Sequence, residues 1–542
     1  MPPALAPVSL NESPTCALRI GVVGHRPPKF LEDKAPQIRT AVCEILTFAR
    51  AFSQDLVKPD QGYAQRPPIL RIVSSLAEGS DRLVAEEGLK LVFKLHCPLP
   101  AFRDDYRQDF APSSAEKFDE LLNRAEAVFE LPGQRAGKWL EPAAYEAAGR
   151  MTLAASDMLI AIWDGEPGER AGTGQMVHEA QQAGIPTVTI NSENPAQIVF
   201  LSPTTGSPAS WRDALHAALT TALQPPASMR GRVAEFVNES VTVPAGDDPI
   251  AAQRDHADWI AGRYADLYRR AYKAVYALAP LAVLCAVAGL WLLINKSDAV
   301  PEWLFPLLEL LCILAILLVT RLGRRGRWHE RWLDARVLAE QFRTWAFLAP
   351  IAQTPPTSRL PPYVSTKATQ GDWTGWYFRS RVREQRPRSA KLTPEYLAEY
   401  QRQLLDVIQG QARHHATKGE GRKRTYERME VATLIFFGST ALACGFHLVW
   451  PLATLGALTA ALPAIGAAFE GLQAQGEYQR LSERAEGMCH FFASIQSRLP
   501  EPKVRQLTYT DLAQLAHEVS GVMLDELSDW RNLVRVRILH PV

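Results

Sequence analysis

The sequence predicts a doubly wound, Rossmann-like α/β domain followed by an all-α membrane domain with four transmembrane helices in two hairpins. Residues 17–191 alternate short β-branched runs with helical stretches, the pattern of an α/β domain. Four later runs, at residues 275–294, 303–320, 431–449 and 452–469, are almost continuously apolar. Each is long enough to cross a hydrocarbon core of about 30 Å. At 542 residues the chain also exceeds the size of one compact domain.

The α/β region contains a strand candidate in each of its β-branched runs, and most of these runs lead into glycine-containing turns. A mostly parallel sheet places its ligand crevice at the carboxyl ends of its strands. The predicted strands are residues 18–23, 69–74, 92–97, 127–131, 158–163 and 187–190.

Shifts in composition divide the rest of the chain. Residues 1–16 are rich in proline, and residues 196–250 are rich in Pro, Ser, Thr and Gly apart from one amphipathic helix at 210–223. The predicted parts are a flexible N-terminus (1–16), the α/β domain (17–195), a linker (196–250), a first helix–span–span–helix unit (251–350), an irregular Pro- and Trp-rich connection (351–392), a second such unit (393–500) and a C-terminal cytosolic helical segment (501–542).

The charges that flank the apolar runs predict their orientation. Lysines and arginines cluster before the first and third runs and after the second and fourth, whereas the loops within each pair offer only Lys296 or no charge. By the positive-inside rule both hairpins extend outward from the cytoplasm, and both chain termini lie inside. The alternative, two buried helical hairpins in a soluble core, is disfavoured by the length of the runs.

Composition excludes several classes of function. Lys+Arg 59 against Asp+Glu 58 gives a net charge of +1, so no excess of positive charge exists for a nucleic-acid partner. The 7 cysteines are scattered, without a C-x-x-C pair or a histidine cluster, which predicts no metal site and buried thiols in a reducing compartment.

Turn motifs at predicted strand ends indicate an anion site. Residues 24–26 follow the first strand, residues 78–82 the second and residues 164–165 the fifth, while residues 172–175 open a helix whose N–H groups suit an anion. Each motif also has an ordinary explanation, namely an exposed turn, a helix N-cap or a tight glycine turn. Their convergence on one sheet edge favours a ligand. The candidate ligand-binding residues are Gly24, His25, Arg26, Glu78, Gly79, Ser80, Asp81, Arg82, Asp164, Gly165, Gly172, Thr173, Gly174 and Gln175.

Together with residues 145–150, these motifs resemble the SLOG superfamily, Rossmann-like nucleotide-binding domains related to the LOG phosphoribohydrolases, to DprA and to the N-terminal domains of melastatin-type TRP channels. The membrane half resembles the SLATT type of effector domain through its architecture and through residues 328–334 and 376–379. The resemblance implies a multi-pass protein of the bacterial inner membrane, active in antiphage defence. Its cytosolic domain would sense a nucleotide-derived signal and trigger oligomeric pore formation or membrane disruption.

The sequence departs from the enzymatic relatives at one position. LOG hydrolases carry P-G-G-x-G-T-x-x-E, and the glutamate position aligned on Gly172 and Thr173 is Met176 here. Loss of that carboxylate favours binding without hydrolysis, with no catalytic residue and no cofactor. Glu179, or Glu78 and Asp81, could substitute, so a membrane-tethered nucleotide hydrolase or phosphoribohydrolase of the LOG type stays an alternative. A scaffold that has lost its ligand is a third.

The membrane half carries one candidate functional residue and predicts a homo-oligomer. Glu309 lies about six residues into the second run, where an acid is costly unless it faces water or a partner. It either contacts a pore or another subunit, or it reaches the outer interface. To shift a pore from almost always closed to almost always open, a ligand must bind the open state more tightly than the closed state by about 5.5 kcal/mol. One small ligand can scarcely supply this difference, but several identical sensor domains in one oligomer can share it.

Overall fold

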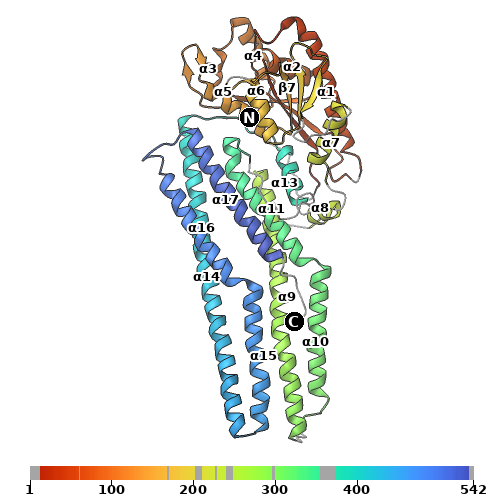
Figure 1. The fold of residues 1–542 in the computed structure, drawn as a ribbon, viewed down its shortest axis with the longest axis vertical. Helices are drawn as coiled ribbons and strands as arrows, with labels where there is room; N and C mark the ends of the chain where they lie inside the picture. The colour runs from red at the N-terminus through yellow and green to blue at the C-terminus, as the bar shows by residue number, and fades with distance from the viewer. Residues whose placement is uncertain are drawn as a thin grey trace. The chain divides into compact units, whose positions relative to one another are not determined.

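The computed structural model describes residues 12–59, 61–167, 170–201, 210–225, 229–239, 248–295, 300–354 and 373–535. The chain divides into two compact units, and each unit is assembled from three separate segments (Figure 1). We call them the sheet unit and the helical unit. The sheet unit comprises Met1–Arg254, Glu340–Arg402 and Glu501–Leu524, and the helical unit comprises Asp255–Ala339, Gln403–Pro500 and Asp525–Val542.

The sheet unit is built on an 8-stranded sheet in the order β10-β4-β3-β2-β1-β7-β8-β9. All neighbouring strands are parallel except the antiparallel pair β8 and β9. The predicted doubly wound α/β fold is therefore confirmed in its Rossmann-like sheet. The strands are β1 (Ala17–Gly24), β2 (Ile69–Val73), β3 (Lys94–Leu99), β4 (Ala127–Glu130), β7 (Met158–Trp163), β8 (Thr187–Asn191), β9 (Ile198–Leu201) and β10 (Ala390–Lys391).

The two central strands are buried on both faces. In β1 and β7 nearly every residue is buried, because helices cover both sides of a parallel sheet. Each predicted strand is confirmed to within a few residues at its ends. A separate two-stranded ribbon pairs β5 (Arg135–Ala136) with β6 (Trp139–Leu140). The helices of this region are α1 (Ala35–Asp55), α2 (Ser80–Lys90), α3 (Arg103–Arg107), α4 (Pro112–Asn123), α5 (Pro142–Ala154) and α6 (Thr173–Gln182), with a short 3-10 turn at Glu32–Lys34.

The predicted linker at 196–250 is corrected by the structure. Its described part adds β9 to the sheet and forms helices α7 (Trp211–Leu223) and α8 (Arg230–Val237). The helix predicted at 210–223 is confirmed as α7. Its leucines at 215, 219 and 223 are fully buried. Composition favoured a linker, but this spacing of leucines provides an apolar face that packs on the sheet unit.

The predicted irregular connection at 351–392 is also corrected where it is described. Residues Trp373–Glu384 form helix α13, and Ala390–Lys391 form β10, which pairs with β4. Arg383 of α13 is buried and reaches Asp157 at 2.7 Å. Buried aromatic rings and a buried ion pair therefore fix this proline-rich stretch to the sheet unit. The connection's residues 355–372 lie outside the described part of the chain.

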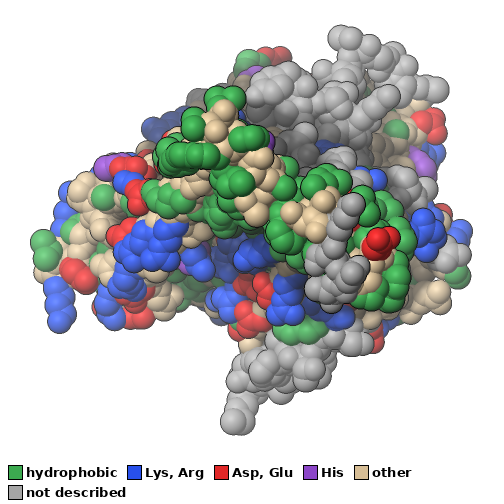
Figure 2. All heavy atoms as spheres, turned by 90° about the horizontal axis from the view of Figure 1, so that it is seen from below, with side chains coloured by type: hydrophobic (Ala, Val, Ile, Leu, Met, Phe, Trp, Pro, Cys, Tyr) green, Lys and Arg blue, Asp and Glu red, His purple; other side chains and the backbone are tan. Residues whose placement is uncertain are grey.

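Among the described residues, four helices are long and apolar enough to cross a membrane, and their apolar stretches belong to the helical unit. The first and third continue without a break from polar segments, so α14 unites the helix predicted from residue 394 with the third apolar run. Seen from below, mainly hydrophobic side chains cover the near ends of these helices (Figure 2). The four helices are α9 (Pro249–Ile294), α10 (Leu304–Arg325), α14 (Pro394–Val449) and α15 (Ala453–Gly476), accompanied by α11 (Trp328–Leu348), α16 (Tyr478–Arg498) and α17 (Tyr509–Arg535).

Several side-chain contacts connect the apolar helices of the helical unit to one another. The rings of Phe436 in α14 and Phe469 in α15 stack 5.7 Å apart. A side chain at Gly289 in α9 would meet Phe305 of α10. The α9 helix also touches α15, because a Cβ at Gly471 would lie 2.2 Å from Cε1 of Tyr276. Small residues thus permit close helix packing at these crossings.

Candidate functional site

The candidate site lies at the carboxyl ends of β1 and β7, where the strand order reverses. From β1 the chain proceeds through β2, β3 and β4 on one side, and then returns to β7 and β8 on the other. Such a switch point leaves a crevice that is the usual ligand site of an open α/β sheet. His25 follows β1 and Asp164 follows β7, and His25 Nε2 lies 3.0 Å from Asp164 Oδ1. Lys29 Nζ approaches the other oxygen of Asp164 at 3.3 Å.

The turn after β2 packs tightly against the end of β1. Ser80 Oγ donates a hydrogen bond to the carbonyl oxygen of His25 at 2.9 Å. A Cβ at Gly24 would lie 2.3 Å from the Cβ of Ser80, so only glycine fits there. Gly79 has a φ of +91°, and its Cβ would lie 2.9 Å from the same carbonyl. These glycines and Ser80 bring two strand ends together, and their backbone lies where a ligand would bind.

Asp81 is the buried acid of this edge. It is 6% exposed, and Ser74 Oγ donates to its carboxylate at 3.2 Å. Burial raises the pKa of Asp81 to about 6, although the charge of Arg26 and the hydrogen bonds that it accepts act in the opposite direction. Acids with strongly shifted pKa values cluster at functional sites. Glu78, one turn earlier in the chain, is half-buried.

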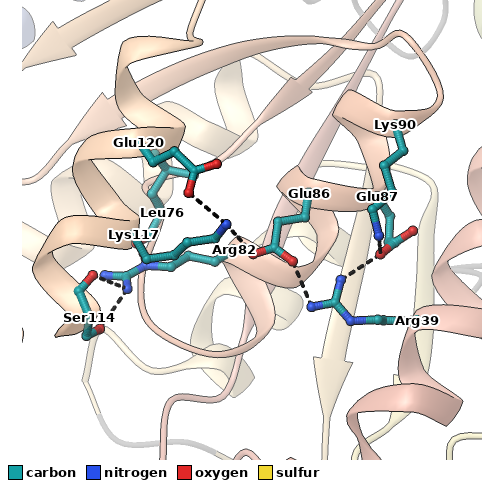
Figure 3. A network of polar contacts seen from close by, with 9 residues as sticks. All are labelled: Arg39, Leu76, Arg82, Glu86, Glu87, Lys90, Ser114, Lys117 and Glu120. Atoms are coloured by element: carbon teal, nitrogen blue, oxygen red, sulfur yellow. Dashed lines mark hydrogen bonds and ion pairs between the residues drawn. The ribbon is translucent and has the colours of Figure 1, made fainter.

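Arg82, although predicted to contact the ligand, is engaged within the protein (Figure 3). Its Nε donates to the carbonyl oxygen of Leu76 at 2.9 Å, and its Nη1 donates to Ser114. The guanidinium lies 4.3 Å from the ring centroid of Phe110. Among the described residues its buried Nη2 has no hydrogen-bond partner. Arg82 therefore stabilises the turn after β2 by hydrogen bonding to it.

Arg26 lies between two tyrosines. Its Nη2 donates to the hydroxyl of Tyr106 at 3.1 Å, and its guanidinium carbon is 4.9 Å from the ring centroid of Tyr145. Burial disfavours the charge, but the neighbouring tyrosines and the acids at 81 and 109 outweigh it and raise the pKa of Arg26. The hydroxyl of Tyr145 donates to Asp109, which Arg135 also contacts at 3.0 Å.

The sequence did not identify four of these residues as ligand-binding candidates: Tyr106, Asp109, Arg135 and Tyr145. Tyr145 stands in the stretch 145–150 that contributes to the family resemblance. The other three follow β3 and β4, whose carboxyl ends belong to the same sheet edge. That position was the available signal. No glycine follows β3 directly, whereas Pro132 and Gly133 follow β4 and mark its end.

A second polar group surrounds the beginning of α6. Gly172 is the N-cap of α6, and Thr173 and Gly174 form its first turn, whose N–H groups have no acceptor within the helix. Gln175 Oε1 accepts from the backbone N–H of Ala171 at 2.7 Å, and its Nε2 donates to Glu146 and Glu179. Glu146 follows Tyr145 on α5, so this helix contributes a residue to each of the two polar groups.

The position of the hydrolase glutamate faces the core. Met176 is 3% exposed and packs in a cluster with Val177 and Leu159. Glu179, a possible substitute, pairs instead with Arg150 at 2.9 Å. In the described part of the chain no group of three or more His, Cys, Asp or Glu side chains could hold a metal ion.

The remaining predicted residues are placed as follows. Gly165 has a φ of +93° and completes the turn after Asp164. Glu309 lies on α10 and is half-buried within the helical unit. No family model matches this chain, and no curated protein sequence matches it either.

Proposed function

We propose that this protein is a membrane effector of the SLOG–SLATT kind in the bacterial inner membrane, acting in antiphage defence. In this proposal a nucleotide-derived anion binds the sheet edge at β1 and β7. The four apolar helices then form an oligomeric pore or disrupt the bilayer. The observation that carries the proposal is the position of Arg26 and of the α6 N-terminus at the point where the strand order reverses.

Three features of this sheet edge suit the three parts of a nucleotide, namely its phosphate, its ribose and its base. The free N–H groups of α6 and the guanidinium of Arg26 attract phosphate oxygens. The carboxylate of Asp164 is of the type that accepts hydrogen bonds from ribose hydroxyls. The partly exposed ring of Tyr145, next to Arg26, offers a face on which a base stacks, whereas the buried Tyr106 holds the guanidinium in place.

For the helical unit we propose two hairpins, α9 with α10 and α14 with α15, which extend outward from the cytoplasm and leave both termini inside. Contacts between the paired helices and the basic residues at their inner ends support this topology. We further propose a homo-oligomer, since several sensors are needed to drive one opening transition. Glu309 then faces a conduit or a neighbouring subunit.

The test uses the full chain in lipid nanodiscs with a panel of nucleotides. A ligand should raise the melting temperature without being consumed, and it should release the contents of liposomes that carry the protein. Arg26→Met and Thr173→Asp should each weaken binding at least tenfold, since a charged hydrogen bond contributes about 1.5–3 kcal/mol. Arg124→Met, at an exposed position of the same unit, is the matched control.

The same experiment distinguishes the membrane effector from a hydrolase and from a scaffold. Turnover of the nucleotide would favour the membrane-tethered hydrolase, for which the raised pKa of Asp81 supplies a proton-holding group near neutral pH. Neither stabilisation nor turnover would favour a scaffold. Unchanged binding in both variants would show that the ligand occupies another site.

A further inference from the structure

A cavity of about 490 Å³ lies in the sheet unit at the edge opposite to the candidate site. Its floor includes Arg19 near the start of β1 and His96 in the first half of β3, and Ala155 at the end of α5 forms part of its wall. The amino-terminal ends of the strands therefore meet a cavity of the size that holds small organic ligands.

Three chain segments, each beside a helix that extends into the helical unit, close this cavity. Asp248, Pro249 and Ile250 begin α9, residues 349–353 follow α11, and residues 385–388 precede α14. A molecule in the cavity would touch all three segments.

The rim of the cavity carries positive charge that the described residues do not neutralise. Arg386 and Arg388 are exposed, and neither lies within ion-pair distance of a carboxylate in the described part of the chain. They stand on either side of Pro387, and both line the cavity. Arg19, by contrast, is paired with Asp157 at 3.1 Å. Arg386 already donates one hydrogen bond, to the carbonyl oxygen of Glu126 at 2.9 Å, but a carbonyl leaves its charge uncompensated, so both rim arginines can pair with an anion.

The floor of the cavity presents a buried imidazole with unused hydrogen-bonding capacity. His96 is only 6% exposed, and its ring makes no hydrogen bond to any residue that the structure describes. Burial, with the charges of Arg71 and Arg19, lowers the pKa of His96 to about 3, so the ring is neutral. A neutral imidazole offers one donor and one acceptor. A buried polar group of this kind normally has a partner.

We propose that this cavity is a second binding site, which takes a small heteroaromatic anion. The uncharged body of the ligand hydrogen-bonds to His96 and packs on the apolar wall that includes Trp345 and Ile250. Its phosphate or carboxylate pairs with Arg386 and Arg388. An acyl chain fits less well, because it would leave the imidazole without a partner.

A cysteine placed in the wall reports occupancy of this site alone. Gln385 lines the cavity, so the full-length Gln385→Cys protein in nanodiscs is treated with N-ethylmaleimide, and alkylation of residue 385 is followed by mass spectrometry. The probes are adenosine 5′-monophosphate, indole-3-acetate, decanoate and inorganic phosphate. At least one of the two heteroaromatic anions should slow alkylation about tenfold, whereas decanoate and phosphate should not. The first two probes distinguish a phosphate from a carboxylate.

Variants then test the residues. Arg386→Gln with Arg388→Gln, and separately His96→Gln, should raise the half-protecting concentration at least tenfold, while Arg124→Gln should leave it unchanged. Arg26→Met should also leave it unchanged, which separates this site from the proposed nucleotide site. Protection by none of the probes, protection by decanoate or phosphate alone, or protection that survives the double arginine variant would overturn the proposal.

Discussion

Replacement of Arg383 by methionine should destabilise the sheet unit strongly. Arg383 lies on α13, between the second and third apolar helices in sequence, yet its Nε donates to Asp157 beside β7 at 2.7 Å. Asp157 also accepts from Arg19, and Arg71 donates to the backbone carbonyl of Arg383 at 2.7 Å. Arg383 thus joins α13 to two central strands of the sheet.

The size of the effect follows from the pKa of Asp157. Although burial disfavours its charge, Arg19 and Arg383 lower the pKa of Asp157 to about 2, from an ordinary value of 3.8. That difference corresponds to about 2.4 kcal/mol of stability. Because the folded pKa is the lower one, this contribution is complete above about pH 4 and is lost as the pH falls toward 2. Removal of one member of a buried pair costs about 3–5 kcal/mol, since the other charge stays buried.

Hydrogen exchange of the full chain in nanodiscs at pH 7 measures this change locally. Arg383→Met should speed the exchange of β1, β7 and α13 amides at least a hundredfold, since about 1.36 kcal/mol corresponds to a factor of ten. Arg379→Met, at an exposed position on the same helix, should have little effect. The double variant Asp157→Asn with Arg383→Met should lose less free energy of unfolding than the sum of the losses in the two single variants. Equal exchange in the variants at 383 and 379 would refute the role given to the ion pair.

Two further substitutions test other parts of the structure. Asp81→Asn should raise the stability of the sheet unit by up to about 3 kcal/mol at pH 7, because the folded pKa of about 6 lies above the ordinary 3.8 and ionisation costs stability as the pH rises through that window. Thermal unfolding should show this gain shrinking toward pH 4, and a gain independent of pH would contradict the assignment. Gly471→Val should separate α15 from Tyr276 and cost about 1–3 kcal/mol, whereas Gly438→Ala, which meets open space, should not. Tyr276→Leu should rescue the valine variant in the same unfolding assay, and a failure to rescue would show that the contact is not limiting.

The strands of the sheet were predictable because each is a short β-branched run that ends in a turn. Parallel strands buried on both faces need continuous apolar sequence, and residues 158–163 show it plainly. The apolar helices were predictable for a similar reason, since length and hydropathy alone determine whether a helix can span a membrane.

The contribution of residues 373–391 to the sheet unit was not predictable by the same means. The two-residue strand β10 has too few side chains to show a pattern, and its pairing with β4 joins positions far apart in the chain. Within the candidate site, glycine turns identified the ends of β1, β2 and β7. The roles of Tyr106 and Asp109 depend on neighbours that only the folded sheet supplies.

Deletion of residues 1–250 should therefore leave helix α13 without its packing partners, and we expect the remaining chain to be damaged rather than released as an active pore. The deletion removes Asp157, and it removes the carbonyl of Leu223, to which Trp376 Nε1 donates at 2.6 Å. It also removes Tyr63, whose ring contacts that of Trp376.

Helix α13 would then expose its buried aromatic rings and arginines to water, because the sheet that covers them is absent. Limited proteolysis in membranes should cut the truncated chain within residues 373–402 and leave the intact chain uncut there. Arg383→Met in the full chain should give an intermediate cleavage rate. A truncated protein that resists cleavage in this segment and permeabilises liposomes without ligand would instead show that the helical unit folds and opens without the sheet.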